Sequence, residues 1–257
     1  MATKPASVLI TGANRGLGLE MVKQMVERYH SLGILFACCR DPDRPKAEGL
    51  KTLASKYPNI ITVLHLDVTD LCSIKTAAQQ VGSLVGTGGL NLLINNAGIL
   101  LRGNLQDTSP EDMHTSFNTN VVGPMNIIKE FQPLLKTAAK ASGIPGMSSK
   151  KAAVINIGAL LGALESVPYS YTFLPALSYR ISKAGMNMLT LCASEELKKD
   201  GVLFSVLHPG WVRTDMGGPM GELDAQESVK GMLNVIATLT KKQNGGFLDY
   251  SGKTLPW

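Results

Sequence analysis

Tyr179 and Lys183 stand four residues apart, within the run from Ser178 to Gly185, and both side chains titrate. On a helix, residues at this spacing share a face. A lysine ammonium roughly 4 Å from a phenol, at an effective dielectric of about 20, contributes on the order of 4 kcal/mol, or about three pKa units. We therefore expect the pKa of the Tyr179 hydroxyl to fall from about 10 toward 7, so that this phenol can exchange a proton with a carbonyl oxygen. The same pair also occurs on ordinary amphipathic helices, so the surrounding sequence must show whether this pair is catalytic or structural.

A glycine-rich turn occupies residues 11–18, where Gly12, Gly16 and Gly18 follow the spacing Gly-x-x-x-Gly-x-Gly. It comes directly after a short apolar run and before a helical pattern that extends to Tyr29. Glycine lets backbone N–H groups approach a ligand closely, and a helix N-terminus favours an anion such as a pyrophosphate. The turn therefore predicts a dinucleotide site. The alternative is an ordinary strand-to-helix turn.

Arg40 follows the second apolar run, at the position that distinguishes two dinucleotides. An acidic residue there would accept the ribose 2′-OH of NAD, whereas a guanidinium pairs with the 2′-phosphate of NADP. Arg40 and Arg15 could clamp one phosphate, which favours NADP as the cofactor. Asp41 is the competing partner, because its carboxylate could hold Arg40 in a surface ion pair instead.

Apolar, β-branched runs alternate with helical patterns along the chain, as in sheets covered on both faces. Strands are predicted over residues 7–11, 33–39, 60–66, 90–95, 152–158 and 202–208. Helices are predicted over residues 16–29, 47–56, 70–85, 109–140 with a break near Asn118, and 177–199. This alternation predicts an α/β fold: a single domain over residues 1–257, with a doubly wound parallel sheet of the Rossmann type and helices on both faces.

Three segments interrupt this rhythm: residues 141–151, 165–175 and 217–224. Their glycines, prolines and hydroxyl residues predict loops. The second lies just before the Tyr179 helix and the third follows a strand, so both are expected near the reaction centre. Residues 217–224 are a candidate lid over a substrate.

Composition excludes several classes of protein. Among the 257 residues, 44% are hydrophobic and 18% are charged, so the chain is expected to be compact. The net charge is +5, but the paired lysines are dispersed and lack interleaved aromatic residues, so no nucleic-acid partner is predicted. The first apolar run, Val8 to Ile10, is too short for a signal-peptide core or a membrane span, and the cytosol is the default compartment. The four cysteines lack metal or redox spacing, so we expect buried free thiols and no metal site.

Taken together, these motifs resemble the short-chain dehydrogenase/reductase family. The resemblance covers nearly the whole chain, and the order and strand positions of the motifs agree. Its end motifs, from Pro209 to Met216 and from Leu255 to Trp257, are most similar to the Sniffer and C-factor-like carbonyl reductases within that family. The other matching residues are Thr11 to Gly18, Asp67-Val68, Asn95 to Gly98, Asn120 and the Tyr179/Lys183 pair.

The resemblance implies an NADPH-dependent carbonyl reductase that transfers hydride to an aldehyde, ketone or quinone. Tyr179 would be the general acid, Lys183 would lower its pKa and hold the nicotinamide ribose, and the backbone of Asn120 would fix a water that relays protons. For Asn120, a capped or kinked helix is the alternative interpretation. Cofactor contacts are implied for Gly12, Asn14, Arg15, Gly16, Leu17, Gly18, Arg40, Asp67, Val68, Asn96, Ala97, Gly98, Tyr179, Lys183, Pro209, Gly210, Val212 and Thr214. Among these, Asp67 would meet the adenine, and the last four would hold the nicotinamide amide.

One position departs from the family pattern. The family places a serine hydroxyl just after the fifth strand, where this chain has Ala159. Losing one such donor typically costs roughly 10²- to 10³-fold in rate. Ser166, or a hydroxyl from residues 169–172, could replace it. The chain is therefore a slowed reductase or one with a relocated donor.

Two other functions stay open at this stage. The alternative to a reductase is an NADP(H)-binding regulatory or signalling protein whose turnover is weak or absent because of Ala159. An epimerase is less favoured, because the chain lacks a sizeable C-terminal substrate domain. For a reductase the partner is a small-molecule carbonyl substrate. A homodimer could form through the helix carrying Tyr179 and the helix around residues 121–135, although methionines at helical spacing also suit a core.

Overall fold

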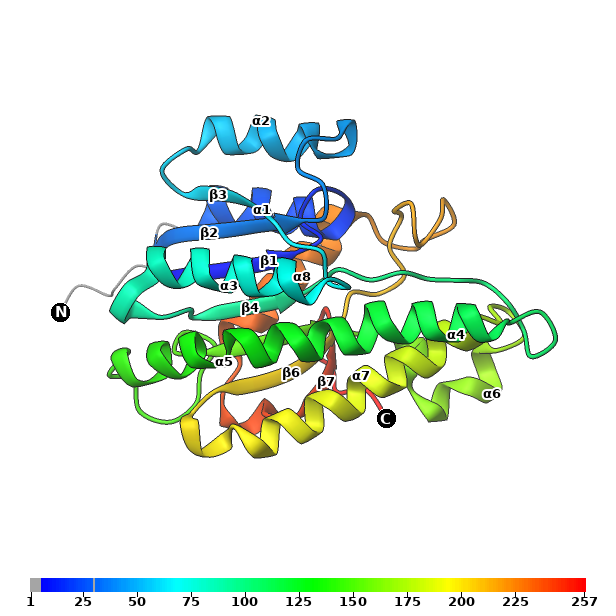
Figure 1. Ribbon diagram of the computed structural model, residues 1–257. Coiled ribbons are helices and arrows are strands. Elements are labelled where there is room, and N and C mark those ends of the chain that lie inside the picture. Colours follow the sequence, from blue (N-terminus) through cyan, green and yellow to red (C-terminus); the bar gives the residue numbers. More distant parts are fainter. Residues whose placement is uncertain (1–5, 30) are drawn as a thin grey trace.

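The computed structural model describes residues 6–29 and 31–257 and contains one seven-stranded, fully parallel sheet (Figure 1). The strand order is β3-β2-β1-β4-β5-β6-β7, so the chain winds outward from β1 in one direction and then, from β4, in the other. This is the doubly wound arrangement, in which the strand order reverses between β1 and β4. The strands are β1 (Ala6–Thr11), β2 (Leu32–Cys39), β3 (Ile61–His65), β4 (Leu92–Asn95), β5 (Ala153–Ile157), β6 (Leu203–His208) and β7 (Gly246–Asp249).

Helices cover both faces of this sheet, which confirms the predicted Rossmann-type fold. One apolar layer joins the sheet to α1, α2 and α8, and the other joins it to α3, α5 and α7, which lie in front of the sheet in Figure 1. Side chains alternate between the two layers: Val8 and Ile10 face the first, and Leu9 faces the second. The helices are α1 (Gly16–Arg28), α2 (Glu48–Lys56), α3 (Leu71–Val85), α4 (Pro110–Phe117), α5 (Gly123–Ala141), α6 (Val167–Ser170), α7 (Leu177–Glu196) and α8 (Ala225–Thr238).

The six predicted strands are all present, and each end lies within two residues of its predicted position. Three elements were missed: the short helix α6, the helix α8 and the strand β7. The strand has only four residues and begins with Gly246, so it carries little periodic pattern. The helix α8 did leave a signal, because Asp224 caps it by accepting a hydrogen bond from the backbone N–H of Glu227.

The predicted break near Asn118 is a π-helical turn, Asn118–Val122, between α4 and α5. Ser109 starts α4 with a capping box, exchanging hydrogen bonds with Asp112. Pro124 stands near the start of α5, where its missing N–H costs little. A π turn adds a residue to a helix locally and is frequent at functional sites. Here it carries Asn120.

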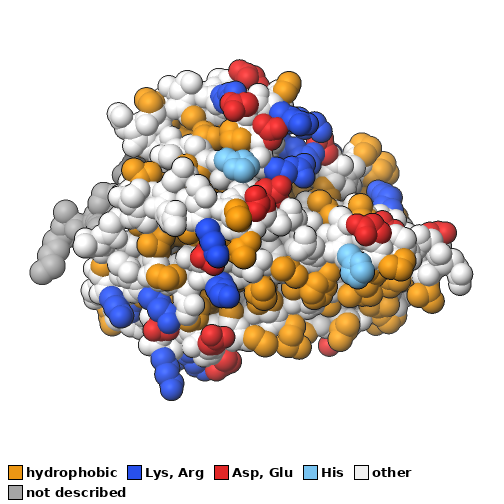
Figure 2. Space-filling view, in the orientation of Figure 1, with side chains coloured by type: hydrophobic (Ala, Val, Ile, Leu, Met, Phe, Trp, Pro, Cys, Tyr) orange, Lys and Arg blue, Asp and Glu red, His pale blue; other side chains and the backbone are white. Residues whose placement is uncertain are grey.

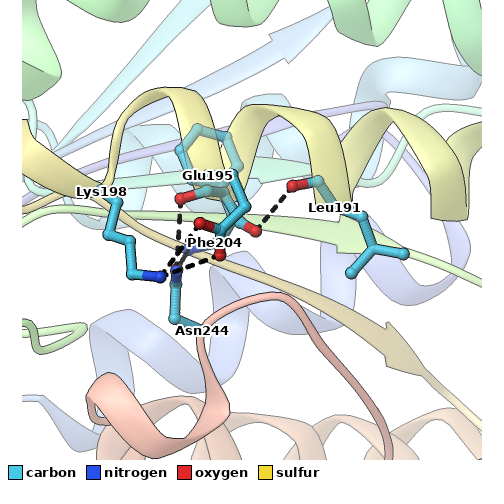
Figure 3. Close-up of polar contacts among 6 residues, drawn as sticks. Leu191, Glu195, Lys198, Phe204 and Asn244 are labelled. Carbon is cyan, nitrogen blue, oxygen red and sulfur yellow. Dashed lines mark hydrogen bonds and ion pairs between the residues drawn. The ribbon is translucent and has the colours of Figure 1, made fainter.

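The loop predicted at residues 165–175 contains the short helix α6. The carboxyl end of α7, near Glu196, is bonded to the sheet. Asn244 accepts a 2.9 Å hydrogen bond from the backbone N–H of Phe204, at the start of β6, and its amide donates to the carbonyl of Ser194 on α7 at 3.3 Å (Figure 3). Lys198 pairs with Glu195 on the last turn of α7. The helix that carries Tyr179 is therefore fixed at its carboxyl end.

The thiols are divided between interior and surface. Cys38 and Cys39 are buried in β2, as predicted, but Cys72 and Cys192 are exposed on α3 and α7, so the expectation of buried thiols was wrong for half of them. All four cysteines are free. Within the described residues, no helix is long and apolar enough to cross a bilayer.

Candidate active site

The glycine-rich turn lies at the carboxyl end of β1, where α1 begins. Gly12 and Gly16 have positive φ angles of 64° and 52°, which glycine adopts without strain. Gly18 packs against the carbonyl oxygen of Gly12, so any side chain there would collide with the turn. The first turn of α1 contains no acidic residue, and its N-cap, Arg15, makes no side-chain capping bond. The first N–H groups of this helix are thus unopposed by negative charge and suit an anion.

The segment after β4 is bonded to this turn. Oγ1 of Thr11 accepts hydrogen bonds of 3.0 Å from the backbone N–H groups of Asn96 and Ala97. The Asn96 amide donates back to the carbonyls of Thr11 and Gly12, at 2.9 and 3.2 Å. Residues 96–98, which were predicted to contact the cofactor and are called the floor from here on, are therefore held against the glycine turn. The side chain of Asn96 supports the loop backbone.

Arg15 and Arg40 are both exposed. Arg15 forms a 2.8 Å ion pair with Asp215, a residue that the sequence did not link to it. The expected competitor of Arg40 is engaged elsewhere, because Asp41 pairs with Arg44 at 2.6 Å. Among the ion pairs of the described residues, none includes Arg40.

Two further cofactor candidates follow β3. Asp67 accepts hydrogen bonds from the N–H and hydroxyl of Thr69, at 2.9 and 2.8 Å, through one carboxylate oxygen. Val68 is buried beneath it and packs against Gly123, where α5 starts. At the glycine turn, the Asn14 amide donates to the carbonyl of Lys46 at 3.4 Å, while Leu17 packs into the core.

Tyr179 and Lys183 are both buried on α7, at 6% and 5% exposure. The ammonium nitrogen of Lys183 lies 5.6 Å from the centre of the Tyr179 ring and donates a 2.8 Å hydrogen bond to the carbonyl of Ile157. A methyl group on Gly98 would lie 3.7 Å from that nitrogen, so the floor and the helix meet at Lys183. The predicted pairing on one helix face is confirmed.

The electrostatic part of the prediction was wrong for the protein alone. Burial raises the pKa of the Tyr179 hydroxyl, and burial lowers the pKa of Lys183 to about 8. In both cases the cause is loss of hydration, which disfavours the phenolate and the ammonium. His208, at the end of β6, adds no charge at neutral pH: burial lowers its pKa to about 4, while Asp249 raises it and Lys183 lowers it.

Asn120 in the π turn is completely buried, and its side chain links two elements. Its amide oxygen accepts from the N–H of Ile99 at 3.0 Å, and its amide nitrogen donates to the carbonyl of Ile99 and to Oγ of Ser182, both at 2.9 Å. Ser182 in turn donates to the carbonyl of Tyr179 at 2.7 Å. Sequence reasoning missed Ser182, although its place next to Lys183 was the available signal. Asn120 therefore positions the helix that carries Tyr179.

Ala159, where the sequence resemblance led us to expect a serine, packs with Tyr179 in a small apolar cluster. Ser166 does not replace that serine as a donor to the substrate oxygen, because its hydroxyl is directed at the carbonyls of Leu160 and Ala163, each at 2.8 Å. Ser170 donates to the carbonyl of Ser166 at 2.6 Å. Both hydroxyls are thus committed to local backbone. The remaining members of the cluster are Ala176, Leu100, Leu161 and Leu174.

The loop after β6 closes the site from the other side. Gly210 has a φ of 84°, the carbonyl of Pro209 accepts a 2.6 Å bond from Ser228, and Val212 is buried. A methyl group on Gly16 would lie 3.8 Å from Thr214, so this loop overhangs the glycine turn. The structure therefore gathers all the predicted site residues along the carboxyl edge of the sheet.

The candidate lid, residues 217–224, is joined to the segment 165–175 by an aromatic contact. Phe173 and Trp211 meet edge to face, with ring centres 5.5 Å apart, and the Trp211 indole donates to the carbonyl of Gly217 at 2.8 Å. Of the large apolar side chains on these two segments, Tyr169, Phe173 and Met220 remain exposed, and we call this region the entrance to the site.

Comparison with known proteins agrees with this geometry. The short chain dehydrogenase family profile matches residues 6–224. An NADPH-bound carbonyl reductase from chicken fatty liver has 43% sequence identity and a TM-score of 0.93, covering 99% of this chain and 100% of that one. The carbonyl reductase Sniffer of D. melanogaster has 35% identity and a TM-score of 0.92, covering 98% and 99%. The C-signal of Myxococcus xanthus is 37% identical over 174 residues, which is 67% of this chain and 96% of that protein. The chain therefore belongs to the short-chain dehydrogenase family of oxidoreductases.

Proposed function

We propose that this protein is an NADPH-dependent carbonyl reductase that acts on an aldehyde, ketone or quinone. The observation that carries the proposal is the burial of Tyr179 beside Lys183, next to the floor that is bonded to the glycine turn. The chicken and D. melanogaster proteins, which are carbonyl reductases by name, share this fold over nearly the full chain.

The site residues fit NADPH. The glycine turn and the uncapped start of α1 suit the pyrophosphate, and Arg40, free of Asp41, suits the 2′-phosphate. Asp67 has one carboxylate oxygen to offer an adenine, and the loop carrying Pro209, Gly210, Val212 and Thr214 would hold the nicotinamide amide. When bound, this cofactor supplies a hydride to the carbonyl carbon.

Tyr179 gives the proton. Its raised pKa keeps the phenol protonated at neutral pH, which is the form that reduction requires. Once the proton leaves, a buried phenolate needs a positive charge nearby, and Lys183 provides it. We assign Asn120 the further role of holding, through its backbone, a water that returns a proton by way of Lys183. The π turn at Asn120 supports this role, since such turns change the orientation of backbone carbonyls.

Tyr179→Phe tests the proposal. Purified protein is mixed with NADPH and either diacetyl or 9,10-phenanthrenequinone, and the loss of nicotinamide absorbance is followed. Turnover should fall about 10²- to 10⁴-fold, the usual contribution of a general acid, while NADPH affinity measured by fluorescence stays the same. Tyr57→Phe, at the end of α2, is the matched control. Full turnover in Tyr179→Phe would refute the assignment.

The second candidate is an NADP(H)-binding regulatory or signalling protein with weak or no turnover. It is favoured by Ala159, which has no hydroxyl and lies in an apolar cluster, and by the similarity to a protein named C-signal. Tight NADPH binding without reduction of any reactive carbonyl would support this candidate over the first.

We also propose that the protein forms a homodimer. Apolar side chains gather over α4, α5 and α7 (Figure 2), and Phe117, Met125, Ile181 and Met188 are exposed there. Met186, two residues before Met188, is completely buried, so only part of the methionine pattern belongs to the core. Light scattering should give a dimer mass for the wild type and a monomer mass for Met188→Lys. A wild-type monomer would exclude the dimer.

We propose the cytosol as the compartment of this protein. Four free cysteines, two of them exposed, suit a reducing environment. Cell fractionation with a tagged chain tests this, and recovery in a secreted or membrane fraction would contradict it.

A further inference from the structure

Arg180, next to Tyr179 on α7, is a buried cation at 5% exposure. Arginine is rarely buried without a carboxylate, because its charge loses hydration. None of the ion pairs of the described residues includes Arg180. Its partners are neutral: Nε and Nη2 donate to the carbonyl of Leu174 at 3.2 and 2.9 Å, Nη1 donates to Oγ of Ser170 at 3.1 Å, and the guanidinium lies 5.4 Å from the ring centre of Tyr171.

All three partners of Arg180 belong to one stretch of chain, residues 170–174. Leu174 packs against the apolar cluster of Ala159 and Tyr179, and Phe173 meets Trp211 at the entrance. This stretch is therefore one wall of the space in front of Tyr179. Adjacent residues on a helix do not face the same way, so Arg180 lies behind the wall while Tyr179 lies in front of it.

Because position 159 carries alanine, this wall should contribute more to the orientation of the substrate. With one hydroxyl fewer to hold the substrate oxygen, the orientation of the carbonyl depends more on the shape of the surrounding apolar surface. A small displacement of reacting groups can cost about 10²-fold in rate. Arg180 is the described cation that joins this wall to the helix carrying the proton donor.

We propose that Arg180 is a positioning residue that determines substrate specificity, by holding Leu174 and Phe173 at a fixed distance from Tyr179. The inference rests on the proposed reductase function. It does not place Arg180 in contact with the substrate. A carbonyl compound large enough to touch the wall should depend on Arg180, and a small one should not.

The test compares Arg180→Met, which removes the donors and keeps an unbranched apolar stem, with Arg180→Lys, which keeps the charge. The substrates are diacetyl, as the small carbonyl, and 9,10-phenanthrenequinone, as the large one. For Arg180→Met we expect KM for the quinone to rise about 10-fold, with less than about threefold change for diacetyl, and Arg180→Lys should restore part of the loss. NADPH affinity should be unchanged. Arg28→Met, an exposed arginine at the end of α1, is the matched control.

Equal losses for both substrates, or no loss for either, would overturn the proposal. If Arg180→Met does not fold, Ser170→Ala replaces it, since it removes one acceptor of Arg180. A rise of about threefold in quinone KM alone then supports the proposal, and unchanged selectivity overturns it. Failure of the underlying function has a different signature, because the wild type would then bind NADPH and reduce neither carbonyl.

Discussion

The ammonium group of Lys183 donates a 2.8 Å hydrogen bond to the backbone carbonyl of Ile157, the last residue of β5. This bond ties the lysine to the sheet instead of leaving it free to move toward the Tyr179 hydroxyl. It also accounts for how a buried ammonium group is tolerated, because one of its three donors is satisfied by protein.

The lowered pKa of Lys183 predicts the pH dependence of reduction. The lysine loses its charge as pH rises through about 8, and the phenolate left by Tyr179 then has no positive neighbour. The rate should be constant from about pH 6 to about pH 8 and fall about tenfold per pH unit above that. Tyr179, with its raised pKa, stays protonated over this range.

Measurement of kcat/KM against pH checks this. Lys183→Arg keeps its charge throughout and should lose the alkaline decline, whatever its absolute rate. A decline at the same pH in that variant would assign the titration to another group.

Lys183→Met should stabilise the cofactor-free protein. The folded pKa of Lys183, about 8, lies below the unfolded value of 10.5, so burying the protonated lysine destabilises the folded state. This penalty is absent above pH 10.5 and grows as pH falls toward 8, below which it is complete. The methionine variant avoids the penalty at neutral pH. After subtraction of the lost hydrogen bond to Ile157, we expect a gain of about 1 to 2 kcal/mol in the free energy of unfolding at about pH 7.

Urea unfolding at several pH values tests this gain, which should shrink toward zero near about pH 10. The same variant should have lost its turnover. A Lys183→Met protein that is less stable than wild type at neutral pH would show that burial does not dominate the lysine's energetics.

Ala159→Ser should speed reduction. Because Ser166 and Ser170 are bonded to local backbone, neither replaces the expected serine, and a serine at position 159 should raise kcat about 10- to 100-fold with a simple ketone. The rise should be smaller with a quinone, whose reduced oxygen is less basic.

Ser166→Ala is the companion variant. It should leave kcat unchanged and cost about 1 kcal/mol of stability, since its bonds to Leu160 and Ala163 are structural. An unchanged rate in Ala159→Ser, together with a slowed Ser166→Ala, would mean that the donor has been relocated.

Arg40→Ala should reduce the preference for NADPH over NADH by about tenfold or more. The guanidinium of Arg40 is expected to pair with the 2′-phosphate, which NADH lacks, and Asp41 does not compete because it pairs with Arg44. Fluorescence titration with both nucleotides measures the ratio, and Arg28→Ala is the surface control. An unaltered ratio would remove Arg40 from the site.

The central fold could be predicted from sequence because its signals are local. Each of the first six strands is a nearly continuous apolar run, and each motif follows the end of its strand, so the parallel topology brings the motifs to one edge. The pairing of Tyr179 with Lys183 needed only helical spacing. The strand β7 escaped prediction because four residues at a sheet edge carry no distinctive period.

The energetics and the long-range contacts could not be predicted in this way. The pKa of Tyr179 depends on how completely the packing of Ala159 and its neighbours excludes water, which spacing along the chain does not encode. Likewise, the partners of Asn120 and of Arg180 come from segments that meet only in the folded chain.

The ion pair between Arg15 and Asp215 joins positions 200 residues apart in the chain, one in the glycine turn and one in the overhanging loop. If Arg15 contacts the nucleotide, as the sequence predicts, the nucleotide phosphate must compete with that carboxylate for the same guanidinium. Binding of the phosphate and formation of the Arg15–Asp215 ion pair then oppose each other, and each weakens the other by the same free energy.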